Sequence, residues 1–197
     1  IVFDGHVYNH KLEPHQVTAM GMARTFQNIR LWNDMTVTDN ICVSQYSRLG
    51  YNLLDVWSNN ARYGREEQRV RHKAAKILEI MELTDVAQEC PKNLPYGLQR
   101  RVEIARALAT EPKLLLLDEP AAGMNPSETA ELTETIRRIR DEFNIAVLLI
   151  EHDMSLVMGI CEGIAVLNFG RIIAKGTPDE IRNNPQVIEA YLGKKEG

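Results

Sequence analysis

The sequence predicts an α/β fold built on a parallel sheet, and three consecutive segments carry this prediction. Residues 114–117 (LLLL) form an all-apolar run of strand length, and IAVLLI at residues 145–150 is a second such run. Between them, residues 127–143 place apolar side chains at helical spacing. Two apolar strands joined by a helix are typical of a right-handed parallel crossover, in which we expect both strands to be buried on both faces.

Shorter elements are predicted before this unit. The opening IVFDGHVY has the pattern of a β-hairpin that turns at Asp4 and Gly5. A short helix is expected to begin near Pro14 and to end at Gly21. Residues 35–64 are rich in aromatic and polar side chains without a clean period, so we interpret them as short helices and loops on the surface.

Two longer helices are predicted in the middle of the chain. Residues 65–83 are amphipathic, and their apolar face comprises Val70, Ala74, Ile77, Leu78 and Met81. Residues 99–110 follow the loop LPYGL and form the second helix. We expect residues 35–100 to make a helical subdomain within a single domain that spans residues 1–197.

The C-terminal region predicts a hairpin and a closing helix. Strands at residues 164–167 and 171–175 flank a Phe-Gly turn. The last helix opens with TPDE, in which Thr177 is the N-cap and Glu180 completes a capping box.

The composition indicates an ordinary globular protein and argues against a nucleic-acid binder. Hydrophobic residues make up 44% and charged residues 25%, and the net charge is −4, whereas nucleic-acid-binding domains are usually basic. The pairs Arg100–Arg101 and Arg137–Arg138 are diluted by nearby acids, and we interpret them as solvated helix faces. Three cysteines without a C-x-x-C spacing favour free thiols over a disulfide framework.

Polar side chains follow both apolar strands. Asp118 and Glu119 come directly after the first strand, and Glu151 and His152 after the second. In parallel sheets ligands bind beyond the carboxyl ends of the strands, so these residues predict a site at one edge of the sheet. A strand-end aspartate can hold Mg²⁺ beside nucleotide phosphates, and a glutamate next to it can orient an attacking water. The alternative is an ordinary polar strand end.

The order of several motifs resembles the ATP-binding subunits of ABC transporters, and the resemblance covers nearly the whole chain. LPYGLQRRVEIARAL, LLLLDEPAAGMNP and LLIEHD follow one another as the signature loop, the Walker B strand with its D-loop, and the histidine switch. In RTFQNIRLW, Gln27 matches the glutamine of the Q-loop. Asp118 matches the Walker B aspartate, Glu119 the catalytic glutamate and His152 the switch histidine. Taken singly, Gln27 could be a surface glutamine and His152 a structural histidine.

This resemblance implies a P-loop NTPase-like core that uses ATP and Mg²⁺. It implies that Asp118 holds the metal, that Glu119 polarises the attacking water and that His152 contacts the γ-phosphate. Gln27 is then expected to join the metal shell and to link the site to a membrane partner. Gly97, at a helix start, suits a phosphate of ATP held by a second subunit, either an identical copy or a paralogue.

The signature loop departs from the usual family pattern. Pro95 stands where relatives carry serine, Tyr96 where they carry glycine, and Leu98 where they carry glutamine. Pro95 offers a phosphate neither a hydroxyl nor an N–H group. In the D-loop, Asn125 replaces the aspartate of many relatives and retains the ability to hydrogen-bond across a dimer.

The phosphate cradle G-x-x-x-x-G-K-[S/T] does not occur in these 197 residues. In relatives this cradle lies upstream of the strand with which the present sequence begins. We therefore expect Ile1 to be an artificial start, several dozen residues into the natural protein. We also expect the chain as written to bind ATP poorly and not to hydrolyse it.

Within the family, the segments GMARTFQNIRLWNDMTVTDN and GTPDEIRNNPQVIEAYLG resemble the ATPases of branched-chain amino-acid importers. The resemblance implies transmembrane permease subunits, a periplasmic solute-binding protein that selects the solute, and a peripheral location on the cytoplasmic face of the inner membrane. The helical subdomain contains four aromatic residues, Tyr46, Tyr51, Trp57 and Tyr63. They either dock the permease or pack only within the subdomain.

Other functions remain open at this level. Related systems import urea or amides or export lipopolysaccharide, and their signature and Walker B segments are similar. A soluble ABC protein of DNA repair or ribosomes would usually carry a coiled-coil insertion or a second cassette. A non-catalytic fragment is compatible with the missing cradle.

Overall fold

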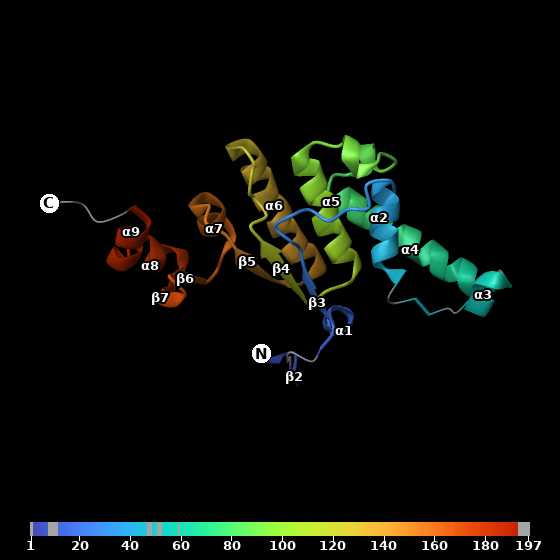
Figure 1. The fold of residues 1–197 in the computed structure, drawn as a ribbon, viewed down its shortest axis with the longest axis horizontal. Helices are drawn as coiled ribbons and strands as arrows, with labels where there is room; N and C mark the ends of the chain where they lie inside the picture. Colours follow the sequence, from blue (N-terminus) through green and yellow to red (C-terminus); the bar gives the residue numbers. More distant parts are fainter. Residues whose placement is uncertain (1, 8–11, 47–48, 51–52, 59, 193–197) are drawn as a thin grey trace.

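A three-stranded parallel sheet lies near the middle of an elongated molecule (Figure 1). The computed structural model describes residues 2–7, 12–46, 49–50, 53–58 and 60–192. The strands are β3 (Met22–Arg24), β4 (Leu114–Asp118) and β5 (Ala146–Ile150), in the order β3-β4-β5. Both strand pairs are parallel, which confirms the predicted sheet.

Helices cover one face of this sheet. α5 (Tyr96–Ala109) and α6 (Pro126–Phe143) pack on the side to which β4 directs Leu115 and Leu117, which are 0% and 1% exposed. On the other side, Leu148 and Ile150 of β5 are 53% and 56% exposed. The prediction that the apolar strands are buried on both faces is therefore wrong, because the helices that pack on the sheet bury only alternate side chains.

The secondary-structure elements that the structure describes between β3 and α5 are all helical. It contains α2 (Val37–Ser44), α3 (Leu53–Trp57), α4 (Ala61–Ile80) and two 3₁₀ turns, η2 (Thr84–Val86) and η3 (Pro91–Asn93). α4 begins before the predicted residue 65 because Asn60 caps it, accepting hydrogen bonds from the N–H groups of Arg62 and Tyr63.

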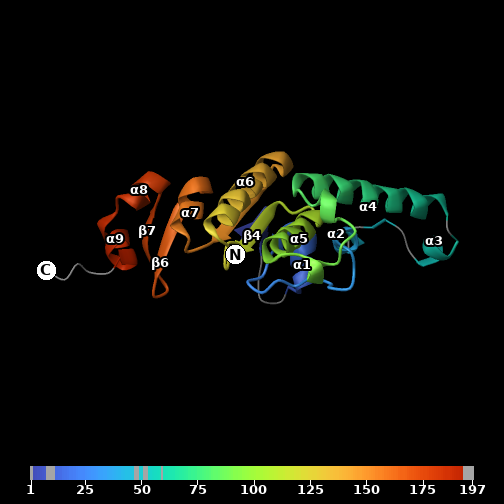
Figure 2. The same ribbon diagram turned by 90° about the horizontal axis from the view of Figure 1, so that it is seen from above.

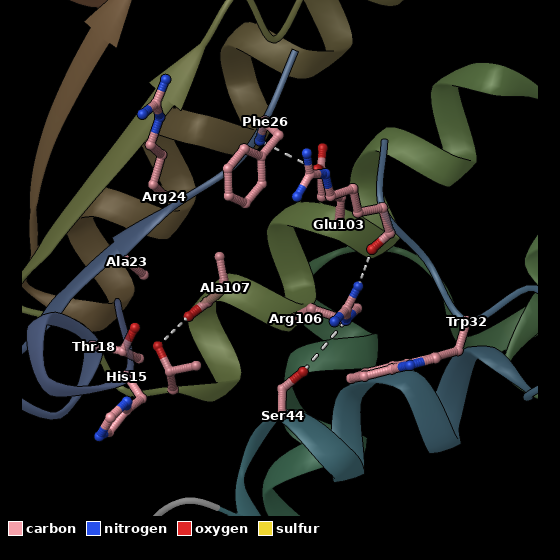
Figure 3. A pocket seen from close by; sticks show the side chains of 12 residues that line it. His15, Thr18, Ala23, Arg24, Phe26, Trp32, Ser44, Glu103, Arg106 and Ala107 are labelled. Atoms are coloured by element: carbon pink, nitrogen blue, oxygen red, sulfur yellow. Dashed lines mark hydrogen bonds between the residues drawn. The ribbon is translucent and has the colours of Figure 1, made fainter. Parts of the chain in front are cut away.

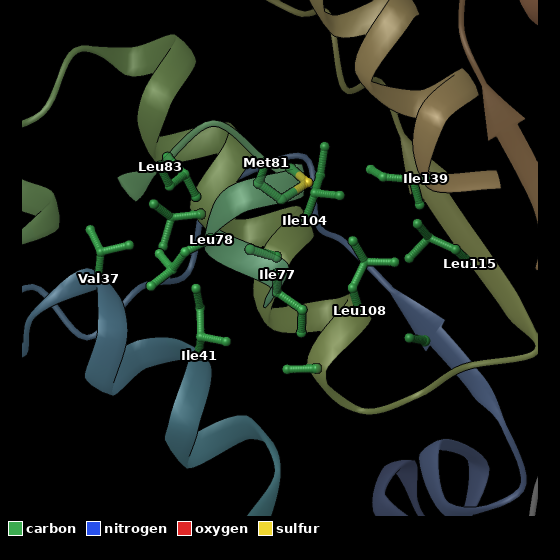
Figure 4. Close-up of a cluster of buried hydrophobic side chains, with 14 of the residues drawn as sticks. Val37, Ile41, Ile77, Leu78, Met81, Leu83, Ile104, Leu108, Leu115 and Ile139 are labelled. Atoms are coloured by element: carbon green, nitrogen blue, oxygen red, sulfur yellow. The ribbon is translucent and has the colours of Figure 1, made fainter. Parts of the chain in front are cut away.

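The helical segment and the sheet share one hydrophobic core. Val37 and Ile41 of α2 are fully buried, and α2 packs against both α4 and α5. Leu108 of α5 lies between this helical cluster and Leu115 of the sheet (Figure 4). The helical segment is thus fixed to the sheet through α5.

The two ends of the chain add smaller elements (Figure 2). At the N-terminal end, β1 (Val2–Phe3) and β2 (His6–Val7) form the predicted hairpin, and α1 (Pro14–Ala19) follows it. At the other end, β6 (Ile164–Asn168) and β7 (Arg171–Gly176) form the second predicted hairpin. Positive φ angles at Asp4, Gly5, Phe169 and Gly170 make the two turns.

Two features of the C-terminal region differ from the prediction. α7 (Met154–Ile160) was not predicted, although Asp153 caps it through hydrogen bonds from the N–H groups of Ser155 and Leu156. The closing helix is two helices, α8 (Pro178–Arg182) and α9 (Pro185–Leu192). The capping box of Thr177 and Glu180 is confirmed. Within the described residues, the search for a helix long and apolar enough to cross a membrane finds none.

The one-sided packing predicts unequal effects of two matched substitutions. Leu117→Ala removes buried methyl groups and should lower the free energy of unfolding by about 2–5 kcal/mol. Leu148→Ala, on the open face, should lower it by less than about 0.5 kcal/mol. Urea denaturation measures both, and equal losses would mean that both faces are covered in solution.

Candidate functional site

The turn after β4 presents the two acidic residues of the predicted site. Asp118 is the last residue of the strand, and Glu119 adopts a left-handed backbone with φ 45°. The N–H group of Glu119 donates a hydrogen bond to the carbonyl of Ile150 at 2.9 Å, which ties the turn to the end of β5. A left-handed conformation costs a non-glycine residue about 1 kcal/mol, so the surrounding contacts must hold it.

The structure brings the predicted residues Gln27, Asp118, Glu119 and His152 to one edge of the sheet. Nε2 of Gln27 donates to Oε2 of Glu119 at 3.0 Å. Nδ1 of His152 lies 3.9 Å from Oε1 of Glu119. Asp118 accepts a 2.7 Å hydrogen bond from Arg24 of β3, and the sequence did not predict this contact.

A buried carboxylate, Glu151, organises both loops of this edge. Its side chain is 1% exposed. Oε1 accepts from the N–H group of Ala121 in the loop after β4 at 2.9 Å. Oε2 accepts from the N–H groups of His152 at 2.9 Å and Asp153 at 3.2 Å in the loop after β5. The sequence analysis placed Glu151 at a strand end and gave it no role. Its position between an apolar strand and a histidine was the signal that could have indicated one.

A buried ion pair on α5, formed by Arg100 and Glu103, holds the Q-loop. The guanidinium of Arg100 donates to the backbone carbonyls of Phe26 at 2.7 Å and Gln27 at 2.9 Å, and to Oε2 of Glu103 at 2.7 Å. Oε1 of Glu103 in turn accepts from the N–H group of Phe26 at 3.3 Å (Figure 3). The pair fixes the backbone from which Gln27 extends toward Glu119.

The interpretation of the Arg100–Arg101 pair as a solvated helix face is therefore wrong. Arg100 is fully buried because the Q-loop carbonyls and Glu103 supply its partners. Arg101 is mostly buried between Glu82 and Glu131. Apart from Glu103, these partners are distant in the sequence, so charge dilution along the chain could not identify them.

The signature loop forms the start of α5. This helix begins at Tyr96, with Pro95 as its N-cap, and not at the predicted residue 99. The hydroxyl of Tyr96 accepts a hydrogen bond from Arg100 at 2.9 Å. A Cβ atom added to Gly97 would lie 3.5 Å from Oε1 of Glu128 on α6, and Leu98 packs against the core. Tyr96 is thus joined to the Q-loop through Arg100.

Asn125 of the D-loop caps α6. Its Oδ1 accepts from the N–H groups of Ser127 at 2.9 Å and Glu128 at 3.0 Å. The carboxylate of Glu128 accepts in turn from the N–H group of Asn125. This capping box uses the side-chain oxygen. A hydrogen bond across a dimer stays a prediction, and it would rely on the Nδ2 amide of Asn125.

The chemistry of the sheet edge fits magnesium better than a transition metal. The candidate ligands are carboxylate and amide oxygens of Asp118, Glu119 and Gln27, the donor type that Mg²⁺ prefers. Mg²⁺ is usually bound through one or two carboxylates together with substrate phosphates and water. The described residues contain no cluster of three or more His, Cys, Asp or Glu side chains that could hold a metal without such help.

A parallel α/β sheet with acidic side chains at its carboxyl edge has the arrangement that a nucleotide-hydrolysing core needs. The family model described as "ABC transporter" matches residues 1–122. A second model, "Branched-chain amino acid ATP-binding cassette transporter", matches residues 171–197. The chain belongs to the ATP-binding subunits of ABC transporters, the transport ATPases that its motifs resemble.

Individual relatives support this assignment. The chain is 47% identical to BraF of Pseudomonas aeruginosa and 48% identical to LivG of Escherichia coli K12, both named high-affinity branched-chain amino acid transport ATP-binding proteins. Each match covers 93% of this chain and 72% of the relative. The ADP-bound ATP-binding cassette MJ1267 has 30% identity and a TM-score of 0.74, covering 93% of this chain and 72% of that one. These matches confirm the predicted family and fold class.

The buried pair on α5 predicts that losing one partner lowers the free energy of unfolding more than losing both. Arg100→Met leaves Glu103 without its cation and the Q-loop carbonyls without donors, so the free energy of unfolding should fall by about 3–5 kcal/mol. Arg100→Met combined with Glu103→Leu should recover a large part of that loss. The control is Arg69→Gln on the exposed face of α4, with a change below about 1 kcal/mol. A double variant no more stable than Arg100→Met would contradict the pairing.

Glu151 predicts a local effect on backbone protection. Glu151→Gln replaces one accepting oxygen by a donor and should lower the free energy of unfolding by about 1–3 kcal/mol. Hydrogen exchange should accelerate at the amides of Ala121, His152 and Asp153. Glu162→Gln, at an exposed carboxylate, is the matched control. Unchanged exchange at Ala121 would show that Glu151 does not link the two loops.

Proposed function

We propose that this chain forms part of the ATPase subunit that powers import of branched-chain amino acids. The observation that carries the proposal is the convergence of Gln27, Glu119 and His152 at the edge where β4 and β5 end. The names of BraF and LivG and the C-terminal family match support the solute class. Related importers of urea or amides and exporters of lipopolysaccharide are the alternatives.

Each residue of the sheet edge has a role that its position supports. Asp118 would hold Mg²⁺, an ion that supplies positive charge to the phosphates of a bound nucleotide. Glu119 orients the attacking water as a hydrogen-bond acceptor. His152, whose side chain is 75% exposed, is free to reach the γ-phosphate. Gln27, which is hydrogen-bonded to Glu119, would supply its amide oxygen to the metal.

The ion pair between Arg24 and Asp118 connects β3 to the proposed site. Arg24 supplies the positive charge beside Asp118 at 2.7 Å. Because this pair is partly exposed, its strength is modest. The guanidinium carbon of Arg24 also lies 5.7 Å from the ring centroid of Phe26.

The start of α5 and the D-loop face a second ATP-binding subunit in this proposal. The first N–H groups of a helix and its dipole favour an anion, so residues 95–98 contact a phosphate of ATP bound to that subunit. Pro95 lacks an N–H group, which leaves the backbone of Gly97 and Leu98 as donors. The partner is an identical copy or a paralogue, and Asn125 contacts it across the interface.

Transmembrane permease subunits are the other proposed partners, with a periplasmic solute-binding protein acting through them. The chain is then peripheral on the cytoplasmic face of the inner membrane. Tyr46 and Trp57 of the helical segment are exposed, as an interface anchor requires. Tyr63 lies in α4, and Tyr51 lies outside the described residues.

The missing phosphate cradle limits what this chain does by itself. The lysine and backbone N–H groups of that motif make most of the direct phosphate contacts in P-loop enzymes. A chain with the sheet edge but without the cradle binds ATP poorly and does not turn it over.

This proposal predicts a clear difference between two polypeptides in Mg²⁺-dependent phosphate release. The 197-residue chain should show no turnover, and the same chain preceded by a cradle-bearing segment should hydrolyse ATP. Glu119→Gln in the extended chain should reduce turnover by about 10²-fold or more, because the water loses its acceptor. Hydrolysis by the short chain would refute the half-site proposal. Failure of both, even with a permease present, would favour a non-catalytic role.

A further inference from the structure

The short helix α3 presents two large apolar side chains to water. Trp57 is 88% exposed and Leu54 is 73% exposed. The two residues are three positions apart, so they lie on one side of the helix. α3 itself lies at the outer end of α4, far from the sheet (Figure 1, Figure 2). Single exposed apolar residues are common on proteins, so this pair indicates a partner only together with its surroundings.

The neighbouring helix α4 carries a stripe of positive charge on the face that points away from the core. Its basic side chains recur every three or four residues, at Arg62, Arg65, Arg69, Lys73 and Lys76. The stripe lies opposite the buried apolar face of α4 and extends over about 20 Å. α4 contains six Arg and Lys residues and three Glu, whereas the whole chain has 23 basic and 27 acidic residues. The positive charge is therefore a local property of this helix.

The stripe begins beside α3 and is only partly balanced by acids. Nη1 of Arg62 lies 4.0 Å from Oδ2 of Asp55 in α3, which places the first cation of the stripe next to the apolar pair. Two further members of the stripe pair with glutamates. Arg65 and Lys76 are exposed, and neither forms an ion pair with a carboxylate of the described residues. Their charge is available to an outside partner.

We propose that α3 and the basic stripe of α4 form a contact with an anionic lipid surface. Basic side chains close to anionic headgroups each add to the affinity for a membrane. Tryptophan is enriched at the boundary between headgroups and acyl chains, and an exposed leucine beside it enters the same layer. A lipid surface offers negative charge over an extended area, so it matches the whole stripe without a fixed register.

Other polyanions fit the stripe but not the apolar pair. A nucleic acid can stack a base on Trp57, but it gains little from Leu54, and the net negative charge of the chain opposes it. An acidic polypeptide would match the charges and leave the pair in water unless it also carried an apolar surface of the right shape. The lipid surface accommodates both features, and it assigns Trp57 to lipid instead of the permease.

This inference extends the peripheral membrane location of the proposed function. Binding to protein-free vesicles requires neither nucleotide nor permease. Its failure would therefore leave the ATPase proposal standing, and ATP turnover is measured separately.

The test uses the 197-residue chain and vesicles of phosphatidylcholine, either alone or mixed with phosphatidylglycerol. In a Trp32→Phe background Trp57 is the sole tryptophan, because the chain has two. The chain should sediment saturably with the anionic vesicles, and the emission of Trp57 should shift to shorter wavelength. Binding to the neutral vesicles should be weaker by about tenfold or more. Added salt should weaken binding to the anionic vesicles.

Matched double variants test the charge of the stripe. Arg65→Gln combined with Lys76→Gln breaks no ion pair of the described residues and should weaken binding by about tenfold or more. Arg171→Gln combined with Lys175→Gln removes the same two kinds of charge from the exposed side chains of the distant β7. This control pair should change the affinity by less than about twofold.

Matched single variants test the apolar pair by sedimentation. Trp57→Ala should weaken binding to the anionic vesicles by about fivefold or more, because the interfacial anchor is lost. Phe169→Ala removes an equally accessible ring, 100% exposed at the turn between β6 and β7, and should leave binding unchanged. Circular dichroism confirms that the variants remain folded, and Leu54→Ser serves if Trp57→Ala does not.

Each result supports or overturns the lipid contact. Equal binding to neutral vesicles overturns it, and so does a loss in the stripe variant no larger than that in its control. Absence of sedimentation at millimolar lipid also overturns it. Poly-L-glutamate and single-stranded RNA are the competing probes, and tighter binding of either one identifies another polyanion as the partner and overturns the proposal.

Discussion

The buried pair of Arg100 and Glu103 is the interaction on which the geometry of the site depends. One turn of α5 carries both charges, and together they satisfy the backbone of Phe26 and Gln27. α5 also packs on the sheet and on α2, so the Q-loop is fixed to a helix that is itself part of the core. Without this pair, the Q-loop backbone would have to exchange three buried hydrogen bonds for water, and Gln27 would lose its fixed position beside Glu119.

Glu151 does for the sheet edge what Arg100 does for the Q-loop. A single buried carboxylate accepts hydrogen bonds from the loops that follow β4 and β5, so Glu119 and His152 cannot move independently. The left-handed backbone of Glu119 is held by the same arrangement, through its bond to Ile150. The residues that we propose to contact ATP are thus positioned by Arg100 and Glu151, whose side chains are themselves buried.

The sequence predicted the elements with strong local signals and missed those set by distant partners. The β4–α6–β5 unit, both hairpins and the capping box at Thr177 follow from patterns within a few residues. Gln27, Glu119 and His152 were found by motif order, and the fold then brought them together. The contacts of Arg100 with the Q-loop carbonyls and of Arg24 with Asp118 could not be predicted, because they join residues 73 to 94 positions apart. The open face of β5 was missed for the same reason, since an apolar run does not tell how many faces are covered.

Residues 24–27 connect β3 to both acidic residues of the sheet edge. Arg24 pairs with Asp118, and Gln27 contacts Glu119. Because Arg100 and Glu103 fix the backbone of Phe26 and Gln27, α5 holds the short segment from which both contacts are made. The geometry of the acidic edge therefore depends on α5 as well as on the strands β4 and β5.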